Sequence, residues 1–204
     1  MSVAEKMTAI NDAIRGKTGK TDKLSLDEMA TEINEISTGE RDINPEWTDW
    51  SYFCSGRPDL AARLKYSDTS KGTNFSYMFY RCSALTSIPA LDTSKGTNFG
   101  SMFYWCFALT TIPVLDTSNS TNFRYMFNSC NALVDLNIVG TINATDLNVQ
   151  SCPLSHDSLM SIINALADKT GVSGTWKVTL GATNLAKLTA EEIAIAEGKG
   201  WTLA

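Results

Sequence analysis

Apolar and polar positions recur along the middle of the chain with a period of 24 residues. Three successive copies cover residues 67–90, 91–114 and 115–138. Each copy begins near a polar DTS segment and continues with T-N-F, M-F, C and L at fixed places. A unit this short cannot bury its own apolar side chains, so each copy must stack on its neighbours. The period therefore predicts a solenoid.

The spacing within each copy predicts a short helix followed by a short strand. In the second copy the apolar side chains lie at i, i+3, i+4 and i+7, which places them on one face of about two helical turns; they are Phe99, Met102, Phe103 and Cys106. The β-prone segments LTSIP and LTTIP follow, and we expect Pro89 and Pro113 to end these strands. We therefore expect an α/β solenoid with short strands on one face and short helical turns on the other.

The sequence TNFSYMFYRCSALTSIP resembles the BspA-type leucine-rich repeat of bacterial surface and phage proteins. The resemblance covers residues 67–138 and holds in three successive copies. It implies a leucine-rich-repeat solenoid with a binding or adhesive role. It does not imply catalysis.

Residues 1–36 predict an N-terminal helical hairpin, because two capping boxes are each followed by an apolar stripe. Residues 9–36 resemble a module of tail and baseplate-associated proteins from phages and prophages of Gram-positive gut bacteria. The resemblance implies attachment to other tail proteins or formation of a homo-oligomer through residues 1–36. A cap that shields the first repeat is an equal alternative.

Residues 37–49 form a polar linker, and residues 50–66 are expected to be a degenerate first repeat in which Trp50 aligns with Phe75 at an offset of 25. Trp47 and Trp50 would then cover the exposed end of the core. Residues 139–204 are expected to form longer repeats that close the C-terminal end. Their predicted elements are a helix from Ser155 to near Gly171, a strand over Thr175–Ala182, a helix with the capping box Thr189–Glu192, and a strand over Trp201–Leu203.

Composition and charge limit the kinds of molecule that the protein is expected to bind. The 204 residues are 43% hydrophobic and carry a net charge of −5, which suits a packed core but not a basic phosphate-binding face. We therefore expect no nucleic acid partner. The first residues contain no long apolar run, so neither a signal peptide nor membrane insertion is expected. This favours synthesis in the bacterial cytoplasm.

Titratable residues form columns rather than clusters. Three of the five cysteines, Cys82, Cys106 and Cys130, recur at one repeat position, which predicts a line of buried free thiols rather than a metal site. Disulfides between adjacent rungs are geometrically allowed. The single histidine, His156, lies at a predicted helix start and not in a triad.

A second column contains Asp68, Asp92 and Asp116. Aligned carboxylates could bind calcium, since hard cations prefer oxygen ligands. Repeated Asx turns are the alternative, and the neighbouring Lys71 and Lys95 favour it. No catalytic residue, metal or cofactor is expected.

Five positions vary between copies while the apolar positions stay. They are Ser76, Tyr77, Tyr80, Arg81 and Ser83 in the first copy, Gly100, Ser101, Tyr104, Trp105 and Phe107 in the second, and Arg124, Tyr125, Asn128, Ser129 and Asn131 in the third. Helical spacing predicts that the first four of each set face water. Recognition surfaces favour aromatic side chains and arginine, so these positions favour a binding surface over neutral drift.

The sequence thus predicts a non-enzymatic recognition protein. The candidate ligand-binding residues are Tyr77, Tyr80, Arg81, Tyr104, Trp105, Phe107, Tyr125, Asn128 and Asn131. The expected setting is a phage or prophage tail in the virion, and the expected partner is a bacterial surface protein or glycan. The alternatives are a BspA-type adhesin at the cell surface and a purely structural tail component; a hydrolase is the weakest hypothesis.

Overall fold

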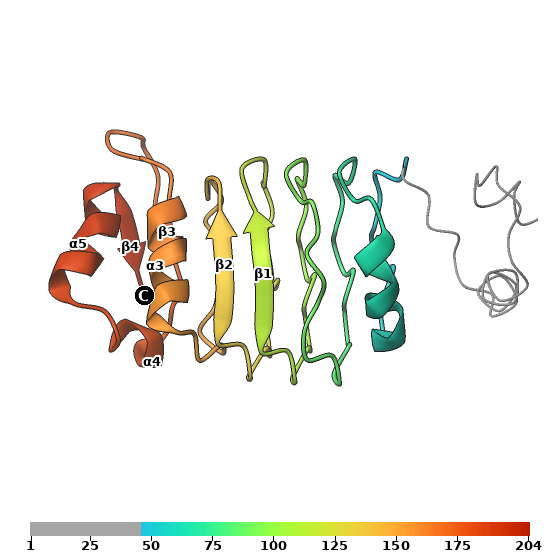
Figure 1. The fold of residues 1–204 in the computed structure, drawn as a ribbon. Coiled ribbons are helices and arrows are strands. Elements are labelled where there is room, and N and C mark those ends of the chain that lie inside the picture. The colour runs from blue at the N-terminus through green and yellow to red at the C-terminus, as the bar shows by residue number, and fades with distance from the viewer. Residues whose placement is uncertain (1–45) are drawn as a thin grey trace, which may run out of the picture. The chain divides into compact units, whose positions relative to one another are not determined.

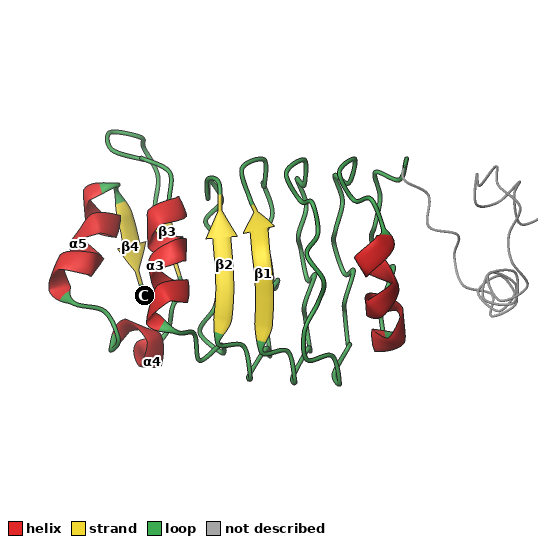
Figure 2. Cartoon of the chain, viewed as in Figure 1, coloured by secondary structure: helices red, strands yellow, loops and turns green. Residues whose placement is uncertain are grey.

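The computed structural model describes residues 46–204, which belong to one compact unit, Pro45–Ala204. The hairpin expected over residues 1–36 and the first part of the expected linker, residues 37–45, lie outside the described residues. Figures 1 and 2 show successive rungs side by side, with turns and loops making up most of each rung. The elements are the 3₁₀ helix η1 (Pro58–Tyr66), β1 (Thr111–Asp116), β2 (Asp135–Val139), α3 (His156–Ala165), β3 (Trp176–Val178), α4 (Ala182–Leu185), α5 (Ala190–Gly198) and β4 (Trp201–Leu203).

Residues 24 apart in sequence lie beside one another in successive rungs. Parallel bridges join Asn74 to Asn98 and Asn98 to Asn122. On another side of the rungs, β1 pairs in parallel with β2, and Thr111 of β1 also bridges to Ser87 of the preceding copy. The repeat period of the sequence is therefore the spacing of the stack.

The apolar positions that the copies share form continuous buried columns. The rings of Phe79 and Phe103 stack with centroids 5.4 Å apart, and Phe103 stacks on Phe127 at 5.8 Å. The predicted core residues of all three copies are at most 1% exposed; they are Phe75, Met78, Phe79, Cys82, Phe99, Met102, Phe103, Cys106, Phe123, Met126, Phe127 and Cys130. The assignment of these residues to the core is confirmed.

The short helices predicted for these segments are not present in the described residues. Each segment is instead a series of tight turns, and alternate backbone N–H groups donate to the next copy. Phe75 N donates to Asn98 O at 2.9 Å and Tyr77 N to Gly100 O at 3.0 Å, whereas Met78 N donates to Phe75 O within the turn. In an α-helix these N–H groups would bond within their own segment. The stack therefore replaces the helical bonds while keeping the same apolar side chains inside.

Two residues in each turn segment have left-handed backbone geometry. In the first copy these are Tyr77 and Arg81, with φ of 58° and 60°. In the second they are Ser101 and Trp105, with φ of 56° and 65°. A positive φ at the third residue is what a type II turn requires, although glycine usually supplies it. Each such residue costs about 1 kcal/mol, which the inter-copy hydrogen bonds and stacked core must offset.

The strands differ from the expected ones. Pro113 does not end β1; it is the extra residue of an irregularity between Ile112 and Val114. The extra residue of a bulge is unpaired in the ladder, so a proline there, which has no N–H, costs no hydrogen bond. The segment ending at Pro89 forms no strand and supplies only the bridge through Ser87.

The aspartate column forms Asx turns, one of the two interpretations that the sequence left open. The carboxylate of Asp92 accepts from Ser94 N at 3.0 Å, and that of Asp116 accepts from Ser118 N at 2.9 Å. The buried Thr93 links the same turns, since its hydroxyl donates to Asp116 O at 3.0 Å. These turns fix the return loop of each copy.

Aromatic packing closes the N-terminal end of the described stack. Trp50 N donates to Asn74 O, and the Trp50 ring meets Trp47 at 5.4 Å and Phe53 at 5.5 Å in edge-to-face contacts. Trp50 is 1% exposed. Its bond to Asn74 corresponds to that of Phe75 with Asn98, so Trp50 takes the place of Phe75 one rung earlier. After this turn the chain enters η1.

Helix α3 takes the place of the next strand beside β2. Two of its hydroxyls accept from the β2 backbone: Leu136 N donates to Ser158 Oγ at 2.9 Å and Ile138 N to Ser161 Oγ at 3.3 Å. Ser155 is the N-cap, as predicted, but the helix ends at Ala165 and not near Gly171. The serine hydroxyls thus accept hydrogen bonds from N–H groups at this edge of β2, which the backbone of a helix could not do.

The last elements form a second small sheet. β3 pairs in parallel with β4, and α5 begins with the predicted capping box of Thr189 and Glu192. His156 Nε2 lies 2.8 Å from Glu192 Oε1 and joins α3 to α5. Within residues 46–204, no helix has the length and apolar content needed to cross a membrane.

Candidate functional site

The nine candidate ligand-binding residues lie on the turn face of the stack, and none of them is buried. Phe107 is 46% and Tyr125 50% exposed. Three neighbours predicted to face water are buried instead; they are Ser76, Gly100 and Ser101. The reason is the turn geometry, because side chains in consecutive turns do not follow the 3.6-residue period used for the prediction.

Four of these residues form a continuous aromatic patch, which we define as Tyr80, Arg81, Tyr104 and Trp105. The Tyr80 ring stacks on Tyr104 at 5.6 Å and on Trp105 at 6.2 Å. The guanidinium of Arg81 lies over the Trp105 ring at 4.6 Å. The patch therefore joins residues from two adjacent copies into one surface. Among the described residues, Phe107 makes no ring contact with this patch.

A second aromatic feature was missed by the sequence analysis. Tyr52 is 52% exposed and lies flat on Tyr77, with centroids 4.7 Å and planes 3° apart. The offset of 25 that aligns Trp50 with Phe75 also aligns Tyr52 with Tyr77, so the signal was present in the sequence. The column of residues at this position continues through Ser101 to Tyr125.

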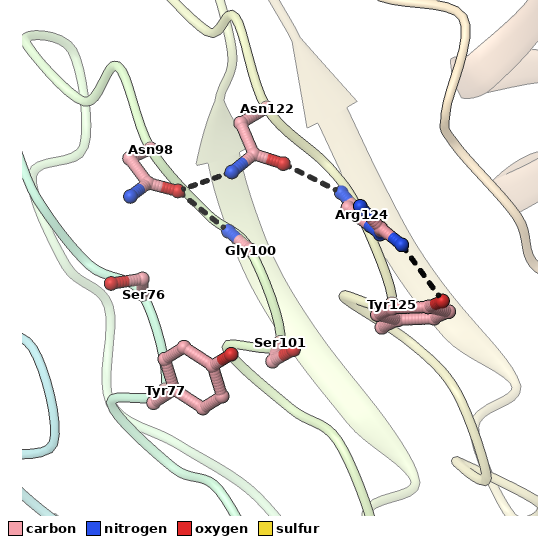
Figure 3. Close-up of a pocket in the computed structure, with 8 residues that line it drawn as sticks. All are labelled: Ser76, Tyr77, Asn98, Gly100, Ser101, Asn122, Arg124 and Tyr125. Carbon is pink, nitrogen blue, oxygen red and sulfur yellow. Dashed lines mark hydrogen bonds between the residues drawn. The ribbon is translucent and has the colours of Figure 1, made fainter.

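A hollow of about 240 Å³ opens at this column, where serine replaces tyrosine (Figure 3). Tyr77 and Tyr125 stand on either side of Ser101 along the stack. Arg124 lies at the hollow beside Tyr125, and its Nη2 donates to the Tyr125 hydroxyl at 3.2 Å. The hollow thus exists because one side chain in the column is small.

Asparagines line the same hollow and form a ladder that the sequence analysis also missed. Asn98 Oδ1 accepts from Gly100 N at 3.0 Å and from Asn122 Nδ2 at 2.9 Å. Asn122 Oδ1 accepts from Arg124 N at 2.9 Å (Figure 3). The recurrence of T-N-F in every copy was the sequence signal for this ladder.

Two cations lie on this face of a chain whose net charge is negative. The chain has a net charge of −5, yet Arg81 lies in the aromatic patch and Arg124 at the hollow. The hydrogen bond and the charge interaction with Tyr125 raise the pKa of Arg124 above its usual value. No carboxylate is among the described residues that line the hollow. The face is therefore suited to an uncharged or anionic ligand.

Comparison with known families bears on the same segment. A family model described as "Mycoplasma protein of unknown function, DUF285" matches residues 27–148, more than half of the chain. The chain belongs to this family. The family is associated with BspA-like repeat proteins, in agreement with the resemblance carried by the 24-residue copies. Comparisons with curated proteins and with solved structures find no match.

The cysteines and the histidine make contacts within the fold of this family member. All five cysteines are free and buried, as predicted for the column of Cys82, Cys106 and Cys130, and burial raises the pKa of Cys82 to about 11 and of Cys106 to about 12. Cys106 Sγ donates to Phe79 O at 3.1 Å. His156 contacts carboxylates of α3 and α5 rather than a nucleophile. In the part of the chain that the structure describes, no three His, Cys, Asp or Glu side chains gather to hold a metal ion.

Proposed function

We propose that the chain is a non-enzymatic recognition protein that contacts a bacterial surface receptor through its turn face. The observation that carries this proposal is the aromatic patch, in which Arg81 stacks on Trp105 and Tyr80 stacks across two copies. Large rigid rings with a polar edge lose little conformational entropy on binding, and tryptophan, tyrosine and arginine dominate binding hot spots. The same rings pack against one another between adjacent copies, so the patch is held in place before a partner binds.

We further propose that the stacked copies are a leucine-rich-repeat solenoid of the BspA type. The 24-residue step, the parallel bridges between copies and the continuous columns of buried side chains support this class. The turn segments contain no helix, so in this proposal the side of each repeat that was expected to be helical is made of turns.

The proposed setting is the tail of a phage or prophage, with a bacterial surface protein or glycan as partner. The resemblance of residues 9–36 to tail-associated modules supports it, and residues 1–36 would join the chain to other tail proteins or to sister chains. A cell-surface adhesin of the BspA type and a structural tail component are the alternatives. Tail-assembly genes beside the coding sequence would favour the tail, whereas a neighbouring sortase gene would favour the adhesin.

The decisive experiment measures binding of the fluorescently labelled full chain to cells of Gram-positive gut bacteria. The test variants are Tyr104→Ala and Trp105→Ala, and the control is Val172→Ala, an exposed apolar residue outside the turn segments. We expect the patch variants to lose binding while remaining folded; because both side chains are half-buried and stack on Tyr80, their free energy of unfolding should fall by about 0.5–3 kcal/mol. Equal binding by the patch variants and the control would contradict the proposal.

A further inference from the structure

We infer that the hollow at Ser101 binds one ring of an acidic sugar, of the uronic acid type, within a glycan. This inference deepens the proposed function and rests on it, because it names the chemical class that the turn face recognises. It concerns the hollow between Tyr77 and Tyr125 (Figure 3) and not the aromatic patch. The two features lie on the same face but are lined by different residues.

The hollow is the result of a single substitution in a column. Tyr77, Ser101 and Tyr125 occupy equivalent positions and share nearly the same φ, which is 58°, 56° and 57°. Their side chains therefore leave the backbone in the same manner in each copy. One rung earlier, Tyr52 and Tyr77 fill the column with rings 4.7 Å apart. A tyrosine in place of Ser101 would close the hollow in the same way.

The size of the hollow suits one small ring. Its 240 Å³ correspond to about eight water molecules at about 30 Å³ each. Sites for drug-sized ligands begin at about 300 Å³. Tyr77 offers apolar ring surface, against which the C–H groups of a sugar ring can pack, whereas the Arg124 guanidinium lies over the Tyr125 ring, 4.9 Å from its centroid. One sugar unit therefore fits better than a larger folded ligand.

The polar groups of the hollow are partly without partners. Ser101 is only 5% exposed, and its hydroxyl makes no hydrogen bond to another described residue. Asn98 uses its Oδ1 twice, while its Nδ2 donates to none of the described residues. Neither atom is among the fully buried unpaired atoms of the described residues, so both reach the water in the hollow, which a ligand rich in hydrogen-bonding groups can replace.

The charge of the hollow selects the kind of sugar. Arg124 supplies a cation and Asn98 supplies a donor, and the described lining residues include no carboxylate; the Asp146 carboxylate, which accepts from Phe123 N, interacts with Arg124 from outside the lining. A ligand carboxylate would form charge-assisted hydrogen bonds with the guanidinium, which are roughly twice as strong as neutral ones. Sugar hydroxyls can then pair with Ser101. An acidic sugar therefore meets both the ring surface and the cation.

The first test titrates the full chain with D-glucuronate and, separately, with D-glucose, followed by calorimetry and by amide NMR shifts. The two sugars share one ring and differ in the carboxylate, so the comparison isolates the charge. We expect D-glucuronate to bind about tenfold or more tightly than D-glucose, with shifts at Ser101 and Asn98, because a hydrogen bond to a charged group is worth about 1.5–3 kcal/mol. Equal or weaker binding of D-glucuronate would overturn the inference.

Two variants test the location. Ser101→Tyr fills the hollow with a ring like those above and below it, and Asn98→Asp keeps both Oδ1 contacts while turning the free donor into a charged oxygen. Each should weaken D-glucuronate binding by about tenfold or more. The control is Ser129→Tyr, which makes the same change at another left-handed position outside the hollow, with φ of 65°. If Ser129→Tyr weakens binding as much as Ser101→Tyr does, the inferred site is wrong.

The outcomes separate this inference from the proposed function. If cells bind the chain and Trp105→Ala abolishes that binding, but D-glucuronate shows no advantage over D-glucose, recognition stands and the acidic-sugar site is overturned. If D-glucuronate binds and Ser101→Tyr abolishes that binding, but no bacterial cells bind the chain, the sugar site stands and bacterial-surface recognition is overturned.

Discussion

Asn122 donates a hydrogen bond from its Nδ2 to Oδ1 of Asn98, 2.9 Å away in the preceding copy. The two residues occupy the same repeat position, but their side chains form different hydrogen bonds. The Asn98 side chain acts only as an acceptor within the described residues, whereas the Asn122 side chain acts as donor and acceptor, since its Oδ1 accepts from Arg124 N. Chemically identical substitutions at the two positions should therefore differ in effect.

We expect Asn122→Asp to lower the free energy of unfolding by about 1–3 kcal/mol, because a carboxylate oxygen would face Asn98 Oδ1 where a donor now stands. Asn98→Asp should cost less, since both of its accepting contacts survive. Urea denaturation of the two variants side by side provides the measurement. Equal losses of unfolding free energy would contradict the assignment of Asn122 as the donor and Asn98 as the acceptor in this ladder.

A glycine at the start of the turn segment makes room for the phenylalanine column. A Cβ atom on Gly96 would lie 2.3 Å from Cζ of Phe99. The equivalent residue in the third copy is the buried Ser120, and there the Phe99 and Phe123 rings stand 6.2 Å apart, compared with 5.5 Å between Phe75 and Phe99. The column is therefore looser beside the residue that has a Cβ.

Gly96→Ala should destabilise the chain by about 1–3 kcal/mol through overpacking against Phe99. The reverse change, Ser120→Gly, should stabilise it by about 1 kcal/mol, because the Ser120 hydroxyl is buried without a hydrogen-bond partner in the described residues. Chemical denaturation measures both. A stabilising Gly96→Ala would mean that the Phe99 ring moves aside without loss of packing.

Left-handed backbone at Trp105 predicts an unusual order of variants. With φ of 65°, Trp105→Gly should be more stable than Trp105→Ala by about 1 kcal/mol. At the neighbouring Tyr104, which is not among the positive-φ residues, Tyr104→Ala should be the more stable by about 0.5–1 kcal/mol. Unfolding free energies of the four variants check this crossover. The same order at both positions would contradict the turn geometry.

Burial should keep the thiols unreactive. Burial raises the pKa of Cys82 to about 11 and of Cys106 to about 12, so these thiols remain protonated at pH 9, where an ordinary cysteine is largely a thiolate. We expect a thiol reagent to label all five cysteines quickly in urea and slowly in buffer at pH 9. Because the folded-state pKa is raised, stability should also fall as pH rises above about 8.5. Fast labelling in buffer would contradict the buried ladder.

The Asx turns predict loss of stability in acid. The hydroxyl of Ser94, and then its N–H, donate to Asp92 and lower its pKa below the usual range. The unfolded chain therefore takes up the proton first, so the contribution is complete above about pH 4 and is lost as pH falls through the lower folded-state pKa. Urea midpoints at pH 7, 4 and 3 should decline, and less steeply for Asp92→Asn. If the urea midpoint of Asp92→Asn declines with falling pH as steeply as that of the unchanged chain, the Asp92 carboxylate is not a source of the acid sensitivity.

The sequence alone determined the spacing of the stack and the content of its core. A period of 24 with unchanged apolar residues identified Met102, Phe103 and Cys106 as buried, because no unit of that length can bury its own side chains. It also placed the caps at Ser155 and Thr189, since capping depends on neighbours in the sequence. Variation between copies correctly predicted the exposure of Tyr125, but the same rule was wrong for Ser101, which is buried at the equivalent position.

Only the tertiary structure decided how each copy is bonded. The spacing of Phe99, Met102 and Phe103 is equally compatible with a helix and with consecutive turns. The choice between them lies with backbone N–H groups that donate to carbonyls of the next copy, a partnership about 23 residues away in sequence. The hollow at Ser101 likewise depends on tyrosines in the copies on either side of it. Local patterns fix which side chains are buried, while contacts between copies fix the backbone path and the shape of the surface.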